Sequence, residues 1–359
     1  MKKSLLALAV LGAFAGAASA QSSVTLFGVV DLSGNYIKNG TAKTYSLQSN
    51  QLNSNRLGFR GIEDLGGGLK AGFWLEAGMA NEQGIMGGSN GLTTSTGANG
   101  ASIFNRRSTV SLFSPMGELR LGRDYDPSFW NTVYDDVNGA NGLGEGLNLI
   151  SSLGSGAITI ARDNNTIGYF LPPNIGGVYG QAMVAAGQSA AVGGTPGEKY
   201  YGARLGWAAG PVDVNVGYGK TKTSPGLSDF IMENVGGSYD FGFIKLYAFY
   251  NRNTFAALKQ AVYELSLSVP LGQGEFRAVY GHADASGRTA AGVDTNPNDA
   301  NLYSVEYVYN LSKRTALYTT AAQIKNKGAA AFSVLPGTAS LNLAGNTSTG
   351  YNLGVRHSF

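Results

Sequence analysis

Apolar and polar residues alternate strictly in many short stretches of this chain. In residues 212–219, for example, Val212, Val214 and Val216 alternate with polar or small residues. A period of two places every apolar side chain on one face of a β-strand. Similar stretches recur at 24–37, 44–62, 68–83, 105–115, 117–124, 157–171, 177–187, 198–209, 212–222, 232–241, 243–254, 261–270, 274–284, 301–310, 313–326 and 347–359. The pattern therefore predicts sixteen strands and an all-β fold.

The connections between these strands fall into two classes. Short connections with turn residues lie at 63–67, 114–117, 209–211 and 270–273, and long ones rich in Gly, Ala, Ser, Thr and Asn lie at 84–104, 188–197, 286–299 and 328–346. A strict alternation of short periplasmic turns and long external loops is typical of a transmembrane barrel, whereas a soluble sandwich does not need that asymmetry. We therefore predict a 16-stranded antiparallel transmembrane β-barrel around an aqueous lumen. The sheet must close, because unpaired backbone groups are costly in hydrocarbon.

The first twenty residues resemble an export signal. Lys2 and Lys3 precede a short apolar stretch at 5–15, and the small residues Ala18 and Ala20 flank the expected cleavage position. This stretch is shorter than the roughly 20 residues that a spanning helix needs, which disfavours the alternative of a membrane anchor. We expect residues 1–20 to be a signal peptide and residues 21–359 to be a single barrel domain.

The composition supports many strands and excludes several chemistries. The chain has 53 Gly, 19 Tyr and 16 Phe, but only 10 Pro and 2 His. It has no cysteine, so disulfides, thiolate nucleophiles and cysteine metal sites are excluded. Without Lys2 and Lys3, 24 basic residues balance 23 acidic ones, a formal net charge of +1. This gives no basis for nucleic-acid binding, and any basic patch must be local.

Several aromatic residues lie near the ends of predicted strands. In a membrane barrel, aromatic side chains form girdles at both interfaces with the lipid. The candidates are Phe27, Tyr45, Tyr169, Tyr201, Tyr218 and Tyr351.

Specific sequence motifs extend this interpretation to a family. The stretches 23–31, 54–71, 117–123 and 162–169 and the C-terminal strand resemble the general porins of β-proteobacteria, the neisserial-type porin family. The last strand carries Tyr351 in its apolar alternation and ends at Phe359. This ending resembles the signal that the barrel assembly machinery recognises. The resemblance implies a homotrimer in the outer membrane, in contact with its lipid, and a third loop folded into the lumen.

That inward-folded third loop would start after Gly122, Arg123 and Asp124 and run to about Ala157. It is the longest gap between clear strands, and a loop of that length is usually functional. It carries the candidate acidic residues of the constriction, which are Asp124, Asp126, Asp135, Asp136 and Glu145.

Parity assigns arginines to the lumen wall. Leu57 and Phe59 are expected to face lipid, so Arg56 and Arg60 face water, and by the same argument Arg162 faces water. The resemblance places Arg56 and Arg162 near the constriction. Arg106 and Arg107 remain ambiguous, because the pair lies next to a loop where the pleat can break, and both are kept as candidates.

Basic wall residues opposite acidic loop residues would create a transverse field that sorts permeating ions. A charge about 5–8 Å away contributes roughly 0.5–1 kcal/mol in a water-like dielectric, so three arginines favour an anion by about 1.5–3 kcal/mol before partial cancellation. We expect an outer-membrane general diffusion porin for small hydrophilic solutes and ions, with a moderate preference for anions.

Two other functions fit the sequence, whereas catalysis fits it poorly. An aromatic slide of Phe129, Trp130, Tyr134 and Phe170 beside basic residues would make a substrate-specific channel for small anionic solutes. The exposed loops, such as 286–299, would instead make an adhesin or a phage-binding surface. His282 and His357 align with lipid-facing neighbours, so neither is placed as a general base. The pair Asp135 and Asp136 lacks EF-hand spacing, and we expect no metal, no cofactor and no enzymatic activity.

Overall fold

The computed structural model describes residues 23–86, 103–155, 160–186, 199–222, 228–335 and 343–359. The expected signal peptide at 1–20 lies outside these residues, as do the whole of loop 188–197 and most of loop 84–104. Within the described residues, no helix is long and apolar enough to cross a membrane.

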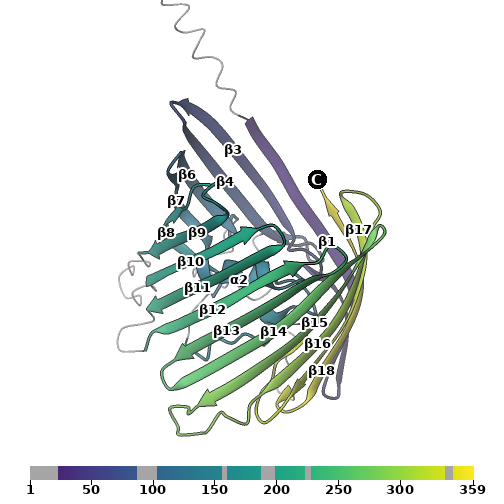
Figure 1. Cartoon of the computed structure of the whole chain (residues 1–359). Coiled ribbons are helices and arrows are strands. Elements are labelled where there is room, and N and C mark those ends of the chain that lie inside the picture. The colour runs from purple at the N-terminus through teal and green to yellow at the C-terminus, as the bar shows by residue number, and fades with distance from the viewer. Residues whose placement is uncertain (1–22, 87–102, 156–159, 187–198, 223–227, 336–342) are drawn as a thin grey trace, which may run out of the picture.

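One continuous antiparallel sheet dominates the structure (Figure 1). Its strands are β1 (Ser23–Asn39), β2 (Ala42–Ser49), β3 (Arg56–Gly66), β4 (Leu69–Ala80), β5 (Ile85–Met86), β6 (Arg107–Ser114), β7 (Gly117–Tyr125), β8 (Arg162–Phe170), β9 (Val178–Ala185), β10 (Lys199–Ala209), β11 (Val212–Lys222), β12 (Phe230–Asp240), β13 (Lys245–Phe255), β14 (Leu258–Leu271), β15 (Gly274–Gly287), β16 (Ala300–Asn310), β17 (Thr315–Asn326) and β18 (Thr347–Ser358). The described residues include two short helices, α2 (Pro127–Asp135) and the 3₁₀ helix η1 (Gly146–Leu149).

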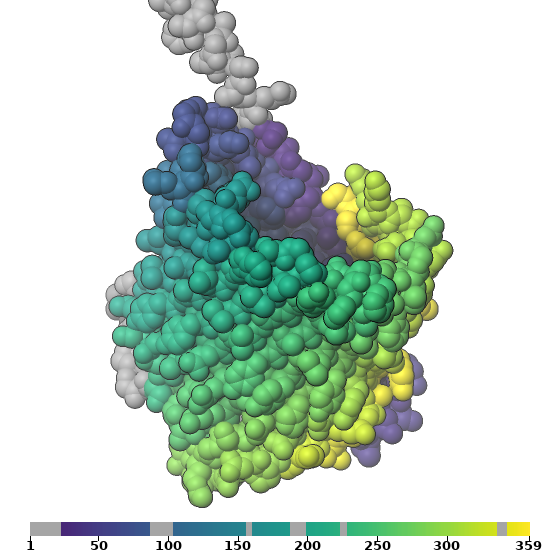
Figure 2. Space-filling model, in the orientation of Figure 1, coloured from purple at the N-terminus to yellow at the C-terminus, as the bar shows by residue number. Residues whose placement is uncertain are grey.

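The sheet closes on itself as a barrel of 16 spanning strands. Both β2 and β3 pair with β1, so they are the two halves of one spanning strand, interrupted at 50–55. The two-residue strand β5 pairs only with the end of β4 and does not span. Pairing of β1 with β18 completes the ring. The predicted closed antiparallel barrel is therefore confirmed, and Figure 2 shows a hollow between its N-terminal and C-terminal strands.

The strict alternation of short and long connections is wrong at two places. Residues 40–41 and 256–257 join strands at the external end, yet each connection is only a two-residue turn. Positive φ angles of 60° at Gly40 and 52° at Ala256 allow these tight reversals. The hairpins β1–β2 and β13–β14 therefore end in tight turns at the external side and carry no long external loop.

Side chains alternate across the sheet as the period of two requires. On β11, Val214 and Val216 are exposed on the outer surface, whereas Asn215 is buried inside. Outer aromatics also cluster, and Tyr36 lies 5.0 Å from Tyr45 between ring centroids. Phe27 is an exception to the predicted girdle, because its ring lies over the lumen side of Gly58 and contacts the Trp74 ring at 5.2 Å.

Candidate functional site

The connection after β7 folds into the barrel and begins with helix α2. Asp126 occupies the N-cap position and Pro127 begins the helix, which suits proline because the first turn needs no N–H donor. Lumen-facing asparagines hold the helix on the wall. Asn234 of β12 accepts from the Asn131 amide at 2.9 Å, and Asn215 of β11 donates to Asp135 at 3.0 Å. In Figure 1, α2 lies inside the barrel behind the strands β10–β12.

The second half of this loop packs in an apolar cluster inside the barrel. Leu143 and Leu149 are fully buried among side chains of β1, β14, β16 and β17, including Leu302 and Ile324. Burial of a leucine side chain contributes about 1.5–3 kcal/mol. The Gln260 amide donates to the Leu149 carbonyl at 2.9 Å. The inserted loop is therefore fixed at both ends, and narrows the lumen from one side.

The connection after β17 also folds inward, which the sequence pattern did not predict. Its residues Val334, Leu335 and Leu343 are buried, and the first two belong to the same apolar cluster as Leu143. The Asn148 amide donates to the Val334 carbonyl at 3.0 Å. Residues 336–342 lie outside the described part of the chain. The part of 328–346 that is described therefore supports the inserted loop.

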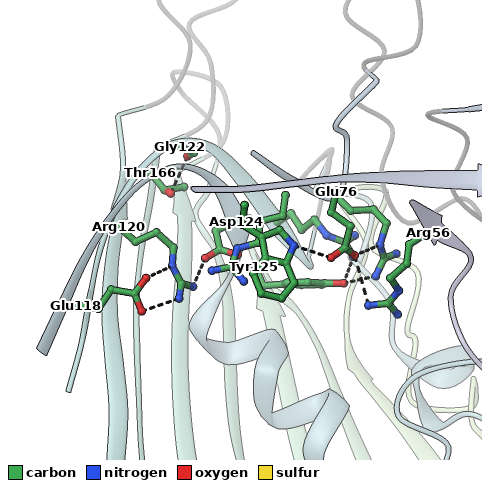
Figure 3. Close-up of polar contacts among 12 residues, drawn as sticks. Arg56, Glu76, Glu118, Arg120, Gly122, Asp124, Tyr125 and Thr166 are labelled. Carbon is green, nitrogen blue, oxygen red and sulfur yellow. Dashed lines mark hydrogen bonds and ion pairs between the residues drawn. The ribbon is translucent and has the colours of Figure 1, made fainter. Parts of the chain in front are cut away.

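On the opposite wall, three predicted arginines contact Tyr125 or Glu76. Figure 3 labels Arg56, Glu76 and Tyr125 in this cluster. Arg106 donates to Glu76 at 2.6 Å and to the Tyr125 hydroxyl at 2.6 Å. Arg162 donates to the same hydroxyl and stacks on the Tyr125 ring with its guanidinium carbon 3.9 Å from the centroid. Arg56 lies 3.4 Å from Glu76 and keeps 28% of its side chain exposed. Two guanidinium groups thus share the Glu76 carboxylate, and the third lies on the Tyr125 ring beside them, which leaves net positive charge at the base of the inserted loop.

Further arginines extend this basic wall. Arg60 and Arg107 both stack near Trp74, with guanidinium carbons 5.1 and 4.5 Å from the ring centroid. Arg107 also lies 3.5 Å from Asp124, which accepts from Arg120 at 2.5 Å. The ambiguity at positions 106 and 107 is resolved in an unexpected way. Both side chains point inward, because Arg106 precedes β6 and is free of its pleat.

Sequence reasoning missed Trp74, Glu76 and Arg120. Trp74 and Glu76 alternate with the outward-facing Phe73 and Leu75 on β4, so the parity argument used for Arg56 would have found them. The Trp74 indole donates to Glu76 at 2.9 Å. These residues orient the arginines.

The candidate acidic residues occupy different places. Asp124 lies within β7, not in the loop. Asp126 is buried next to Asp163, and burial together with the charge of Asp163 raises the pKa of Asp126 well above its usual value. A raised pKa favours the neutral acid, so Asp126 contributes little negative charge to the constriction.

Asp135, Asp136 and Glu145 are buried side chains of the inserted loop. Asn215 of β11 donates to Asp135, and Glu264 of β14 lies near all three carboxyl groups. Burial raises the pKa of Asp135 to about 7 and that of Asp136 to about 6. Burial and the neighbouring Asp136 raise the pKa of Glu145 well above its usual value. The structure therefore does not bring these three carboxyl groups opposite the arginines.

The C-terminal residues lie at the seam of the barrel. Phe359 and Gly28 exchange two backbone hydrogen bonds of 3.1 Å, and the Phe359 ring covers the position where a Cβ of Gly28 would be. Tyr351 is exposed on the outer surface, and its ring centroid lies 6.3 Å from that of Tyr36. Among the described residues, no group of three or more His, Cys, Asp or Glu could hold a metal ion.

A closed membrane-type barrel whose lumen is narrowed by an inserted loop beside a basic wall defines a porin. The chain belongs to the Gram-negative porin family, whose model matches residues 7–329. It is 38% identical to outer membrane porin protein 32 of Delftia acidovorans and 29% identical to an outer membrane porin protein of Bordetella pertussis, with 100% of each chain covered in both cases. The predicted family, the outer-membrane location and the porin function are therefore confirmed.

A solved structure supports the same conclusion. The anion-selective porin from Comamonas acidovorans superposes with a TM-score of 0.81 and 34% sequence identity, over 94% of this chain and 100% of that one. OmpT of Vibrio cholerae, in its trimer form, has a TM-score of 0.67 at 12% identity over 94% of this chain and 99% of that one, which indicates a shared fold.

Proposed function

We propose that this porin is a general diffusion channel with a moderate preference for anions, set by the basic wall of the constriction. The observation that carries the proposal is that Arg56 and Arg106 share the single carboxylate of Glu76, while Arg106 and Arg162 both bind the Tyr125 hydroxyl. The similarity to an anion-selective porin supports it. The carboxyl groups that could cancel this charge are either paired on the same wall or buried behind the loop.

Selectivity in such a channel arises because a permeating ion passes close to the fixed charges of the wall. An ion in the narrowed lumen cannot stay more than a Debye length of about 10 Å at 0.1 M salt from the wall. The guanidinium groups are held by stacking and hydrogen bonds before the ion arrives, so little reorganisation is needed. The wall therefore attracts anions and repels cations during passage, and no specific binding of the solute is required.

Swelling of liposomes that contain the purified protein tests the diffusion mechanism. Neutral sugars of increasing size should enter at rates that fall smoothly with size and stay proportional to concentration. A rate that saturates for one solute class would instead favour a substrate-specific channel for small anionic solutes. One structural observation favours that alternative: the rings of Trp130 and Tyr134 stack along helix α2 of the inserted loop.

We also propose that the protein acts without catalysis, as its porin relatives are channels, and that it assembles as a homotrimer after removal of residues 1–20 by a signal peptidase. Electrophoresis of unheated samples tests the assembly. A trimer that resists dodecyl sulfate until boiling is expected, and a band of monomeric mass before and after boiling would contradict it.

A further inference from the structure

Three aromatic rings form a row from the base of the inserted loop along helix α2. The Tyr125 and Trp130 centroids are 4.8 Å apart, and those of Trp130 and Tyr134 are 5.5 Å apart with nearly parallel planes. Residues 130 and 134 are four positions apart and share one helix face. The opposite face of α2, which includes Ser128 and Asn131, is buried against the wall. The row therefore faces the lumen.

Tyr134 is unusual for a side chain in a polar, water-filled lumen. It is 52% exposed, although it is large and aromatic. Exposed aromatic side chains that are not needed for packing often contribute to binding sites.

Arg204 of β10 closes the far end of the row. Its guanidinium carbon lies 5.9 Å from the Trp130 centroid, 5.1 Å from that of Tyr134 and 5.2 Å from that of Tyr179. Its hydrogen bond to the Asn131 side chain is a long one of 3.4 Å. Within the described ranges, Arg204 has no carboxylate within 4 Å.

The carboxyl groups near Arg204 are held by other residues. Tyr179 donates to Asp213 at 2.5 Å, and Asn215 donates to Asp135 at 3.0 Å. At the other end of the row, Arg162 stacks on Tyr125. The row thus carries a guanidinium group at each end, and its Trp130 and Tyr134 rings lie nearly parallel. Among the described residues, the guanidinium at the Arg204 end has no carboxylate within 4 Å.

We propose that Trp130, Tyr134 and Arg204 form a weak binding subsite for aromatic carboxylates inside the channel, an inference that rests on the proposed anion passage. The solute ring would stack on the exposed Tyr134 ring, while its carboxylate accepts hydrogen bonds from the Arg204 guanidinium. Planar guanidinium groups suit carboxylates because their N–H groups can donate in parallel pairs. A stack on tyrosine adds a preference for flat rings over puckered ones.

Block of the chloride current in planar bilayers tests the subsite with two matched probes. Benzoate and cyclohexanecarboxylate carry the same charge and have similar size, but only benzoate is aromatic. Benzoate is expected to reduce the current in a saturable way, with a half-blocking concentration about threefold to tenfold lower than that of cyclohexanecarboxylate.

Substitutions separate the two halves of the subsite. Tyr134→Ala should raise the half-blocking concentration of benzoate by about threefold to tenfold and leave cyclohexanecarboxylate nearly unchanged. Arg204→Gln should weaken both probes. Arg356→Gln, a lumen-facing change on β18, and Tyr303→Ala, on the outer surface of β16, are matched controls that should keep the wild-type block.

The reversal potential in KCl, measured on the same channels, distinguishes failure of this subsite from failure of the proposed function. Equal block by the two probes, or block that survives both Tyr134→Ala and Arg204→Gln, would overturn the subsite while an anion-selective reversal potential is retained. A wild-type channel without anion selectivity would instead contradict the proposed function itself.

Discussion

Substitution of Arg56 by alanine is the cleanest perturbation of the basic wall. Arg56 is 28% exposed, and its ion-pair partner Glu76 remains bound to Arg106 at 2.6 Å and to Trp74 at 2.9 Å after the change. The substitution therefore removes one lumen charge without leaving a buried carboxylate unpaired. Folding should survive, since lumen substitutions mainly tune selectivity.

The expected size of the effect follows from Coulomb's law. A unit charge about 5–8 Å from an ion contributes roughly 0.5–0.8 kcal/mol in water, and screening at about 0.1 M salt reduces this to roughly 0.2–0.5 kcal/mol. The anion loses this attraction and the cation loses the same repulsion, so the permeability ratio changes by about twofold to fivefold. At about 1 M salt the change should fall below about twofold.

Reversal potentials under a KCl gradient measure this ratio directly. Arg356→Ala serves as the control, because Arg356 faces the lumen at the periplasmic end of β18, far from the inserted loop in sequence. Identical reversal potentials for wild type and Arg56→Ala at low salt would show that the wall arginines do not control selectivity.

Three further outcomes are expected. Arg162→Ala should make single-channel currents noisier than Arg56→Ala does, because Arg162 is only 5% exposed and anchors Tyr125 at the base of the loop. Arg162→Lys should keep the anion preference but also give noisy currents. Equally quiet currents in all three variants would contradict this. Burial raises the pKa of Asp135 to about 7, so the stability that the protonated Asp135 contributes is complete below its unfolded pKa of about 4 and is lost as pH rises through about 7. The thermal midpoint of the wild type should therefore fall more between about pH 5 and 8 than that of Asp135→Asn. Parallel pH profiles of the two proteins would refute this. Deletion of Phe359 should reduce the amount of protein in the outer membrane more than it reduces the yield of refolding in detergent. In detergent, the deletion removes only the two backbone hydrogen bonds between Phe359 and Gly28, a loss of about 1–3 kcal/mol. Normal accumulation of the truncated protein in cells would contradict the role of Phe359 as an assembly signal.

The strands could be predicted from the sequence because lipid imposes the same demand on every one of them. Residues such as Val214, Val216 and Leu353 must be apolar on the outer surface, so the period of two is visible without any knowledge of partners. The same parity placed Arg56, Arg60 and Arg162 inside.

The interior of the barrel was harder to predict, because its contacts join segments far apart in the chain. Nothing local distinguishes Val334 and Leu335, which pack against Leu143, from apolar residues in an external loop. Likewise, the turn of α2 that buries Asp135 against Asn215 cannot be seen in the sequence alone. Asp135, Asp136 and Glu145, which were expected opposite the arginines, are therefore buried away from them.

The sign of the reversal potential of the purified wild-type protein is the most direct test of selectivity set by the basic wall. Under a roughly tenfold KCl gradient with about 0.1 M salt on the dilute side, where screening is weak, chloride should permeate more readily than potassium. The potential should move toward zero as both solutions are raised toward about 1 M at a fixed ratio. A potential of the opposite sign, showing that potassium permeates more readily, would contradict control of the channel by its basic wall.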